Sequence, residues 1–103
     1  MAWSGSNRFG FNEGWVRIYA PAGSGVYAIY AGERWLYIGA TESIRDELLR
    51  HLAGEIPCVA QQNPTHFAFQ SVSAGDRAAR QRELVAEYRP ECNEQALPEG
   101  RAA

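Results

Sequence analysis

Two tyrosines, ten positions apart, are the side chains of this sequence whose type and spacing point most clearly to chemistry. Tyr27 follows Gly25-Val26, and Tyr37 precedes Ile38-Gly39. Two runs rich in Val, Ile, Tyr and Trp flank a short break at Gly32-Glu33-Arg34, which is typical of a β-hairpin. One end of a rigid sheet could hold both phenols, and a phenol can donate or accept a proton there.

Spacing and breakers predict the elements that follow the hairpin. Ile44, Leu48 and Leu52 recur every four residues after Ser43, a good N-cap residue, which predicts a helix over 44–52. Residues 55–65 contain two prolines and are predicted to form a loop.

A third strand and a second helix complete the predicted domain. The run His66–Val72 has β character. Asp76 can cap a helix that continues to Tyr88 and stops before Arg89-Pro90. Along this helix Gln81, Leu84, Val85 and Tyr88 share one face.

The N-terminal region is rich in Gly, Ser and Asn. Trp15–Tyr19 has the composition of a short strand, and the aromatic residues Trp3, Phe9 and Phe11 are predicted to dock on the domain. We expect a partly ordered arm over 1–20, the domain over 21–95 and a tail over 96–103. The fold class is α+β, a small three-stranded antiparallel sheet flanked by helices, to which Trp15–Tyr19 can add an N-terminal strand.

Bulk properties describe one ordinary globular domain of 103 residues without a membrane-spanning run, for which the default compartment is the cytoplasm. The formal net charge is −2, and all ten cationic side chains are arginines. A negative total weakens a nucleic-acid role, although arginine suits phosphate contacts. Cys58 and Cys92 show no metal or redox spacing, so two reduced thiols are favoured over a disulfide.

The segments Gly25-Val26-Tyr27 and Tyr37-Ile38-Gly39, with the ending Pro90-Glu91-Cys92-Asn93, resemble the GIY-YIG nuclease family. Val26 replaces the isoleucine of the first signature. The resemblance spans about residues 25–93 and includes the order of strands and helices. It implies phosphodiester cleavage that uses a tyrosine or a metal-bound water as base, a helix arginine for phosphate charge, a glutamate for one divalent metal, and a closing asparagine.

Some residues of this sequence match the site residues that the resemblance implies, and two do not. Tyr27, Tyr37, Gly39 and Asn93 match the two tyrosines, the signature glycine and the asparagine. Glu47 occupies the position of the arginine, which reverses the charge beside the phosphate. Gln81 occupies the position of the metal-binding glutamate, and an amide is the weaker ligand for a hard cation.

Neighbouring residues could compensate for these two replacements. Arg50 could reach the site or pair with Glu47, whereas Arg45 should point elsewhere. His51 is a candidate base, with a helix-surface position as the plainer interpretation. Glu83 could replace the metal ligand, but a two-residue offset turns it away from the Gln81 face.

Three functions remain open. The favoured one is a nucleic-acid-binding or accessory domain with a degenerate nuclease centre, in which Arg45, Arg50 and Gly39 contact DNA or another nucleic acid and no metal or other cofactor is bound. The second is an active endonuclease that uses Mg²⁺ or Mn²⁺. The third is a protein-interaction domain, and a homo-oligomer or a protein partner fits a domain of this size.

Overall fold

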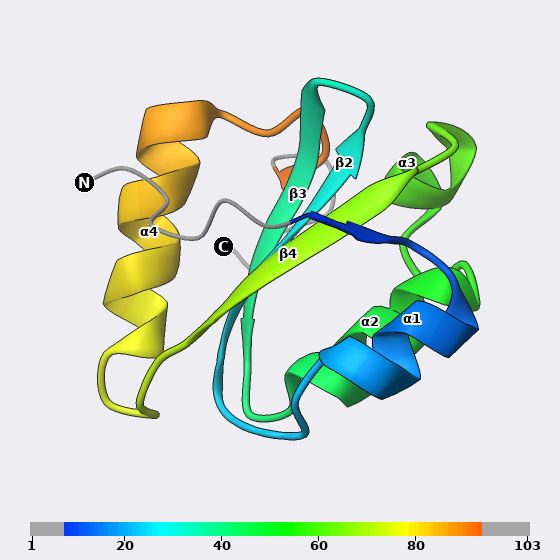
Figure 1. Cartoon of the computed structure of the whole chain (residues 1–103). Coiled ribbons are helices and arrows are strands. Elements are labelled where there is room, and N and C mark those ends of the chain that lie inside the picture. The colour runs from blue at the N-terminus through cyan, green and yellow to red at the C-terminus, as the bar shows by residue number, and fades with distance from the viewer. Residues whose placement is uncertain (1–7, 94–103) are drawn as a thin grey trace.

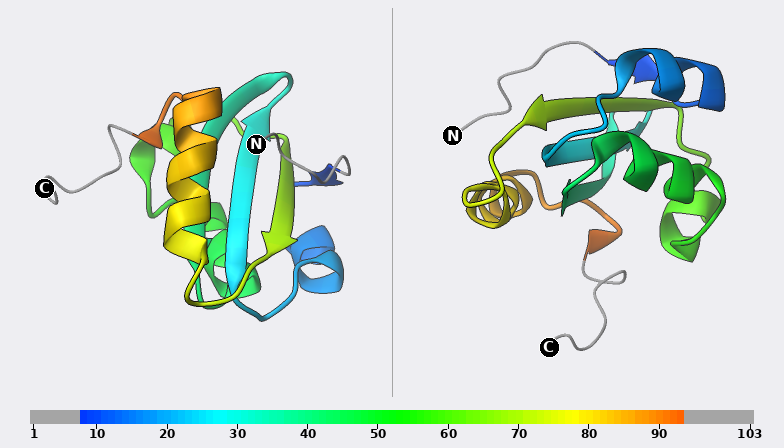
Figure 2. Two further views of the ribbon diagram at one scale, coloured as in Figure 1. Left: turned by 90° about the vertical axis from the view of Figure 1, so that its left-hand side faces the viewer. Right: turned by 90° about the horizontal axis from the view of Figure 1, so that it is seen from below.

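The computed structural model describes residues 8–93, in which four strands form one antiparallel sheet in the order β1-β4-β2-β3. The strands are β1 (Phe9–Gly10), β2 (Gly25–Ala31), β3 (Arg34–Thr41) and β4 (His66–Ser71). The helices are α1 (Glu13–Tyr19), α2 (Ile44–Leu52), α3 (Pro57–Gln61) and α4 (Arg77–Tyr88). Helix α4 lies on one face of the sheet and α1 and α2 on the other (Figure 1, Figure 2). The α+β prediction is therefore confirmed, with four strands.

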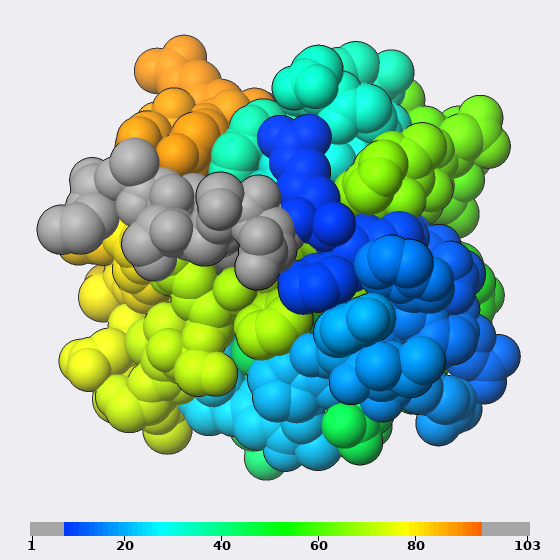
Figure 3. Space-filling view, in the orientation of Figure 1, coloured from blue at the N-terminus to red at the C-terminus, as the bar shows by residue number. Residues whose placement is uncertain are grey.

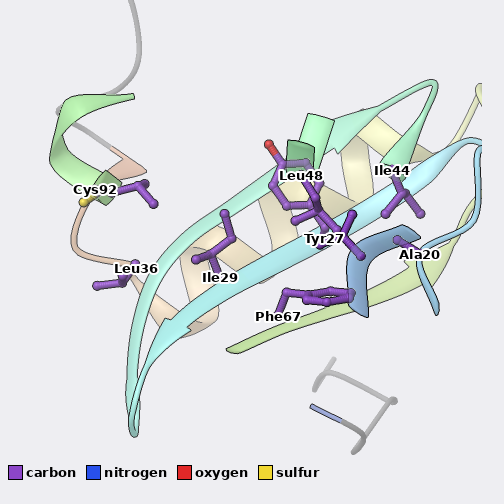
Figure 4. Close-up of a cluster of buried hydrophobic side chains, with 10 residues drawn as sticks. Ala20, Tyr27, Ile29, Leu36, Ile44, Leu48, Phe67 and Cys92 are labelled. Carbon is purple, nitrogen blue, oxygen red and sulfur yellow. The ribbon is translucent and has the colours of Figure 1, made fainter. Parts of the chain in front are cut away.

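Strand β2 lies in the middle of the sheet and is buried on both faces. Tyr27 and Ile29 belong to the core under α1, α2 and α3, whereas Tyr30 belongs to the smaller core under α4. This alternation follows from the two-residue repeat of a strand. The close-up in Figure 4 shows Tyr27, Ile44, Leu48 and Phe67 in the first core, with Leu36 and Cys92 at its other end.

The two long helices have the predicted bounds, although one cap differs. The Ser43 hydroxyl accepts a hydrogen bond from the Asp46 amide at 3.3 Å at the start of α2. At the start of α4, Asp76 has helical backbone angles and makes no side-chain cap. Its carboxylate accepts a hydrogen bond from the Ser73 hydroxyl at 3.0 Å instead.

The prediction of a strand at Trp15–Tyr19 is wrong, because this segment lies within helix α1. Asn12 caps the helix by accepting the Trp15 amide at 3.0 Å. Val16 and Ala20, one turn apart, are both buried against the core. Tertiary burial of this pair outweighs the strand preference of the other residues. The extra N-terminal strand is β1, where Phe9 pairs with Phe67 of β4.

Two further expectations are corrected, one between α2 and β4 and one at the two cysteines. Residues 55–65 contain the short helix α3, and Pro57 occupies a first-turn position, where its missing N–H is harmless. Cys58 of α3 and Cys92 form a disulfide, so the prediction of two reduced thiols is wrong. A sequence separation of 34 carries no pairing signal, and only the fold brings the two cysteines together.

The start of the described chain packs on the domain, as predicted for its aromatic residues. Phe9 and Phe11 both contact the Phe67 ring, at centroid distances of 5.3 and 6.3 Å. In Figure 3 the blue residues of β1 and α1 lie on the face turned to the viewer, beside those of β4. Trp3 and the tail 96–103 lie outside the described residues. Between residues 8 and 93, no helix has the length and apolar character that crossing a membrane requires.

Removal of the α1 cap tests the helical assignment. We expect Asn12→Ala to lower the free energy of unfolding by about 1 kcal/mol, because the Trp15 amide loses its acceptor. Urea denaturation followed by circular dichroism measures this loss. Asn12→Asp is the matched control, since aspartate caps equally well. Equal stability of the alanine variant and the wild type would contradict the capped helix.

Candidate functional site

Tyr27 is held over the backbone of the neighbouring strand. It faces Gly39 across the β2–β3 pair. A Cβ atom built on Gly39 would overlap the ring carbons and the hydroxyl of Tyr27. Glycine at 39 therefore makes room for the phenol, which is 2% exposed.

His51 lies in the core and contacts the tyrosine pair. Its Nε2 shares a hydrogen bond of 2.8 Å with the Tyr27 hydroxyl. The imidazole and Tyr37 ring centroids are 5.1 Å apart, and the two phenol rings are 6.1 Å apart. Helix α2 turns His51 inward, in the same direction as Ile44 and Leu48. The interpretation of His51 as a helix-surface residue is wrong, since it is 4% exposed.

Burial fixes the protonation states of this cluster. It raises the pKa of the Tyr27 hydroxyl well above its ordinary value, and Tyr37 and Glu47 raise it further. The pKa of Tyr37 is raised by burial and then by Glu47. Burial lowers the pKa of His51 from 6.5 to about 4. Near neutral pH the phenols are therefore protonated and the imidazole is neutral, and the burial that disfavours a phenolate also disfavours an imidazolium.

The arginines of α2 make contacts within the chain. Arg50 donates to the carboxylate of Glu47 at 3.0 Å, in an ion pair whose Glu47 side chain is 27% exposed. Arg45 donates to the Ala20 carbonyl at 2.9 Å. Glu47 therefore faces the tyrosine cluster closely enough to raise both phenol pKa values, and Arg50 partly neutralises it.

Gln81 and Asn93 both bind the backbone of Ile38. The Gln81 amide nitrogen donates to the Ile38 carbonyl at 3.0 Å. The Asn93 amide nitrogen donates to the same carbonyl at 2.9 Å, and its oxygen accepts the Ile38 amide at 2.9 Å. These bonds join α4 and the residues after it to the strand that carries Tyr37 and Gly39.

The described residues do not fit a divalent metal ion. Within 8–93, no three His, Cys, Asp or Glu side chains are grouped so that they could hold one. Gln81 offers only a neutral amide, whose nitrogen donates to the Ile38 carbonyl. Glu83 accepts a hydrogen bond from Arg80 at 3.2 Å with a side chain that is 58% exposed.

A pocket of about 440 Å³ lies between the end of β3 and the starts of α2 and α4. Its lining contains two guanidinium groups, Arg50 and Arg77, and three carboxylates, Glu42, Asp46 and Glu47. The residue pattern did not single out Arg77 as a site residue. Arg77 lies one turn before Gln81, and this spacing is the signal that could have placed both on the face toward β3. The Arg77 side chain donates to the Ser24 hydroxyl at 3.0 Å.

The similarity of this chain to known proteins lies in its fold and not in its overall sequence. No protein-family model matches the sequence, and no curated protein does. Among solved structures, the chain is similar to the GIY-YIG N-terminal endonuclease domain of UvrC from Thermotoga maritima bound to magnesium. The TM-score is 0.66 and the sequence identity is 21%, and the match covers 76% of this chain and 94% of that chain. A point mutant of the same domain, with an asparagine replaced by alanine, gives a TM-score of 0.64 and 21% identity over 74% and 91%.

These likenesses confirm the resemblance at the level of fold. The chain has the nuclease-like fold of the GIY-YIG endonuclease domain, and Tyr27, Tyr37, Gly39 and Asn93 lie inside that fold. At 21% identity, the chemistry of the site has to be argued from the side chains themselves.

The buried imidazole predicts how stability depends on pH. His51 has a pKa of about 4 in the folded protein against an ordinary value of 6.5, so the unfolded chain binds the extra proton first as the pH falls. The contribution of the neutral His51 to the free energy of unfolding is complete above pH 6.5. It is lost progressively towards pH 4, by roughly 3 kcal/mol for a pKa shift of this size.

The measurement compares unfolding free energies of the wild type and His51→Gln over this pH range. The difference between the two pH profiles isolates His51 from the carboxylates, which titrate in both proteins. His66→Gln, at the start of β4 and outside the buried core, is the matched control for the loss of a histidine. Parallel profiles for the wild type and His51→Gln would refute a buried neutral imidazole.

Proposed function

We propose that this chain is a nucleic-acid-binding or accessory domain with a nuclease-like fold, and that it does not cleave phosphodiester bonds efficiently. The observation that carries the proposal is the hydrogen bond from the Gln81 amide to the Ile38 carbonyl. At the position where the resemblance implies a metal-binding carboxylate, the side chain is neutral and is used to hold β3 against α4.

The charges around the tyrosine pair support the same conclusion. The pocket that Glu47 and Arg50 help to line contains three carboxylates and two guanidinium groups. A phosphodiester placed there would meet Glu47 where positive charge is needed for the transition state. Arg50 is partly neutralised by its 3.0 Å contact with Glu47. Binding without efficient turnover is therefore the function that these side chains favour.

Arg77 is the group best placed for a phosphate contact. It lines the pocket from α4, opposite the α2 residues, and its hydrogen bond to Ser24 uses one of five N–H donors. Arg45, which is anchored to the Ala20 carbonyl, is a weaker candidate than the sequence alone indicated. DNA is the nucleic acid we would test first, with RNA as the comparison.

One observation favours the alternative of an active endonuclease. The Tyr27–His51 hydrogen bond of 2.8 Å preserves a buried pair that could move a proton. Such an enzyme would need Mg²⁺ or Mn²⁺, and the described residues offer no fitting group for either ion. This alternative therefore ranks second.

A different observation favours a protein-interaction domain. Helix α1 exposes Trp15, Ile18 and Tyr19, which are 44%, 72% and 47% accessible. Exposed apolar side chains of this size often mark contact surfaces. Salt-insensitive absence of nucleic-acid binding would move this alternative to first place.

The first test measures binding of fluorescently labelled oligonucleotides by anisotropy at several salt concentrations. We expect Arg77→Ala to weaken binding severalfold and to reduce the slope of log affinity against log salt by about 0.9, the value for one phosphate contact. Arg82→Ala, which removes an exposed arginine from the same helix, is the control and should change the affinity less. Equal losses in the two variants would argue against a phosphate contact at Arg77.

The second test restores the two charges that the resemblance implies. We expect the wild type to leave DNA uncut in Mg²⁺ or Mn²⁺, and Glu47→Arg combined with Gln81→Glu to introduce metal-dependent cleavage. Each single variant should remain inactive, because phosphate charge and metal binding are both needed. Gel analysis of a labelled duplex gives the result, with Tyr37→Phe in the restored background as the control. Robust cleavage by the wild type would overturn the proposed function.

A further inference from the structure

Residues 90–93, here called the C-terminal strap, run along the open edge of the sheet. The Glu91 amide donates to the Trp35 carbonyl at 3.0 Å, and the Cys92 amide donates to the Leu36 carbonyl at 2.8 Å. Asn93 then holds both backbone groups of Ile38 through its side chain. Because β3 is an edge strand, the strap satisfies backbone groups that no further strand covers.

The C-terminal strap reaches the candidate site through Ile38, whose backbone groups Asn93 binds. Ile38 lies between Tyr37 and Gly39, and its amide has the Asn93 side chain as its acceptor. Its carbonyl also accepts the Gln81 amide. Release of Asn93 would therefore loosen the part of β3 that carries Tyr37 and that supports the Tyr27 ring at Gly39.

Two connections tie the strap to α3 and the residue after it. The first is the Cys58–Cys92 disulfide, in which Cys92 is fully buried and Cys58 is partly exposed. The second is Arg34, which contacts Glu91 at 2.9 Å and the Gln62 side chain at 2.5 Å. The Arg34–Glu91 pair is about half exposed, and exposed pairs contribute little to stability. The disulfide is therefore the dominant connection.

We propose that the Cys58–Cys92 disulfide is a redox modification site, and that its reduction by a dithiol releases the C-terminal strap from β3. The inference does not rest on nucleic-acid binding. It rests on the position of the disulfide, which joins a half-buried cysteine on α3 to a buried cysteine directly before Asn93.

The exchange follows ordinary thiol–disulfide chemistry. A thiolate of the dithiol attacks Sγ of Cys58, the sulfur–sulfur bond breaks, and Cys92 leaves as a thiolate that takes up a proton. The second thiolate of the dithiol attacks its own sulfur in the mixed disulfide, and Cys58 leaves and is protonated. Two electrons pass to the protein, and the dithiol becomes a disulfide.

Amide hydrogen exchange of the full chain by NMR tests the proposal at Ile38. The protein is compared in its oxidised form and after treatment with dithiothreitol at the same pH, with alkylation and mass measurement to count free thiols. We expect two thiols after reduction, and exchange at Ile38 that is at least about tenfold faster, because local opening exposes an amide bound only by the strap. The amides of β2, which is paired on both sides, should change much less, and reoxidation should restore the original rates.

Two variants separate the disulfide from its neighbours. Cys58→Ser keeps Cys92 in the core and should reproduce the reduced exchange rate at Ile38 without reductant. Arg34→Ala keeps the disulfide and should accelerate exchange by less than about threefold, as expected for an exposed ion pair. If Cys58→Ser fails to fold, reversible reduction of the wild type supplies the same comparison.

Three results would overturn the proposal. The first is a disulfide that stays intact in the folded protein under dithiothreitol. The second is an unchanged exchange rate at Ile38 when two free thiols are counted. The third is equal acceleration at Ile38 and throughout β2, which would show that the disulfide supports the whole domain and does not control the strap.

Discussion

The Tyr27 hydroxyl and the His51 imidazole share a buried hydrogen bond of 2.8 Å between the centre of the sheet and helix α2. This bond requires three conditions at once. Strand β2 must pair with β3 so that Tyr27 faces Gly39, position 39 must lack a Cβ atom, and α2 must begin at Ile44 so that His51 turns inward. Because the surrounding core is closely packed, a shift in any of these elements would separate the two groups.

The uncharged side chains of the site are buried together, and its other polar side chains bind residues of the same chain. The phenols and the imidazole form a buried cluster, whereas Arg50 binds Glu47 and Gln81 binds the Ile38 carbonyl. Asn93 binds the same residue from the C-terminal strap. Gln81, at the position where the resemblance implies the metal ligand, and Asn93 thus hold β3 in place, whereas Glu47, at the position of the implied arginine, pairs with Arg50 within α2. This use of the side chains is the physical basis for proposing a domain that binds without efficient cleavage.

Local patterns predicted those elements whose own residues determine them. The hairpin, α2, β4 and α4 were predicted because alternating or four-residue spacing coincides with breakers and caps at their ends. Prediction failed where distant contacts decide the outcome. Trp15–Tyr19 prefers a strand by composition, yet Val16 and Ala20 are buried as one face of a helix. Asp76 marks the start of α4 correctly, but its side chain binds Ser73 instead of capping the helix.

The sequence by itself pointed to the nuclease-like fold and the tyrosine pair, through a resemblance that depends on residue type and short-range spacing, and it placed Glu47 and Gln81 where that resemblance implies an arginine and a glutamate. Only the tertiary structure decided that His51 is buried against Tyr27, that Arg77 lines the pocket, and that Cys58 and Cys92 are joined. Each of these involves residues that are distant along the chain. Their meeting depends on how helices pack on the sheet, and no local pattern of residues encodes that arrangement.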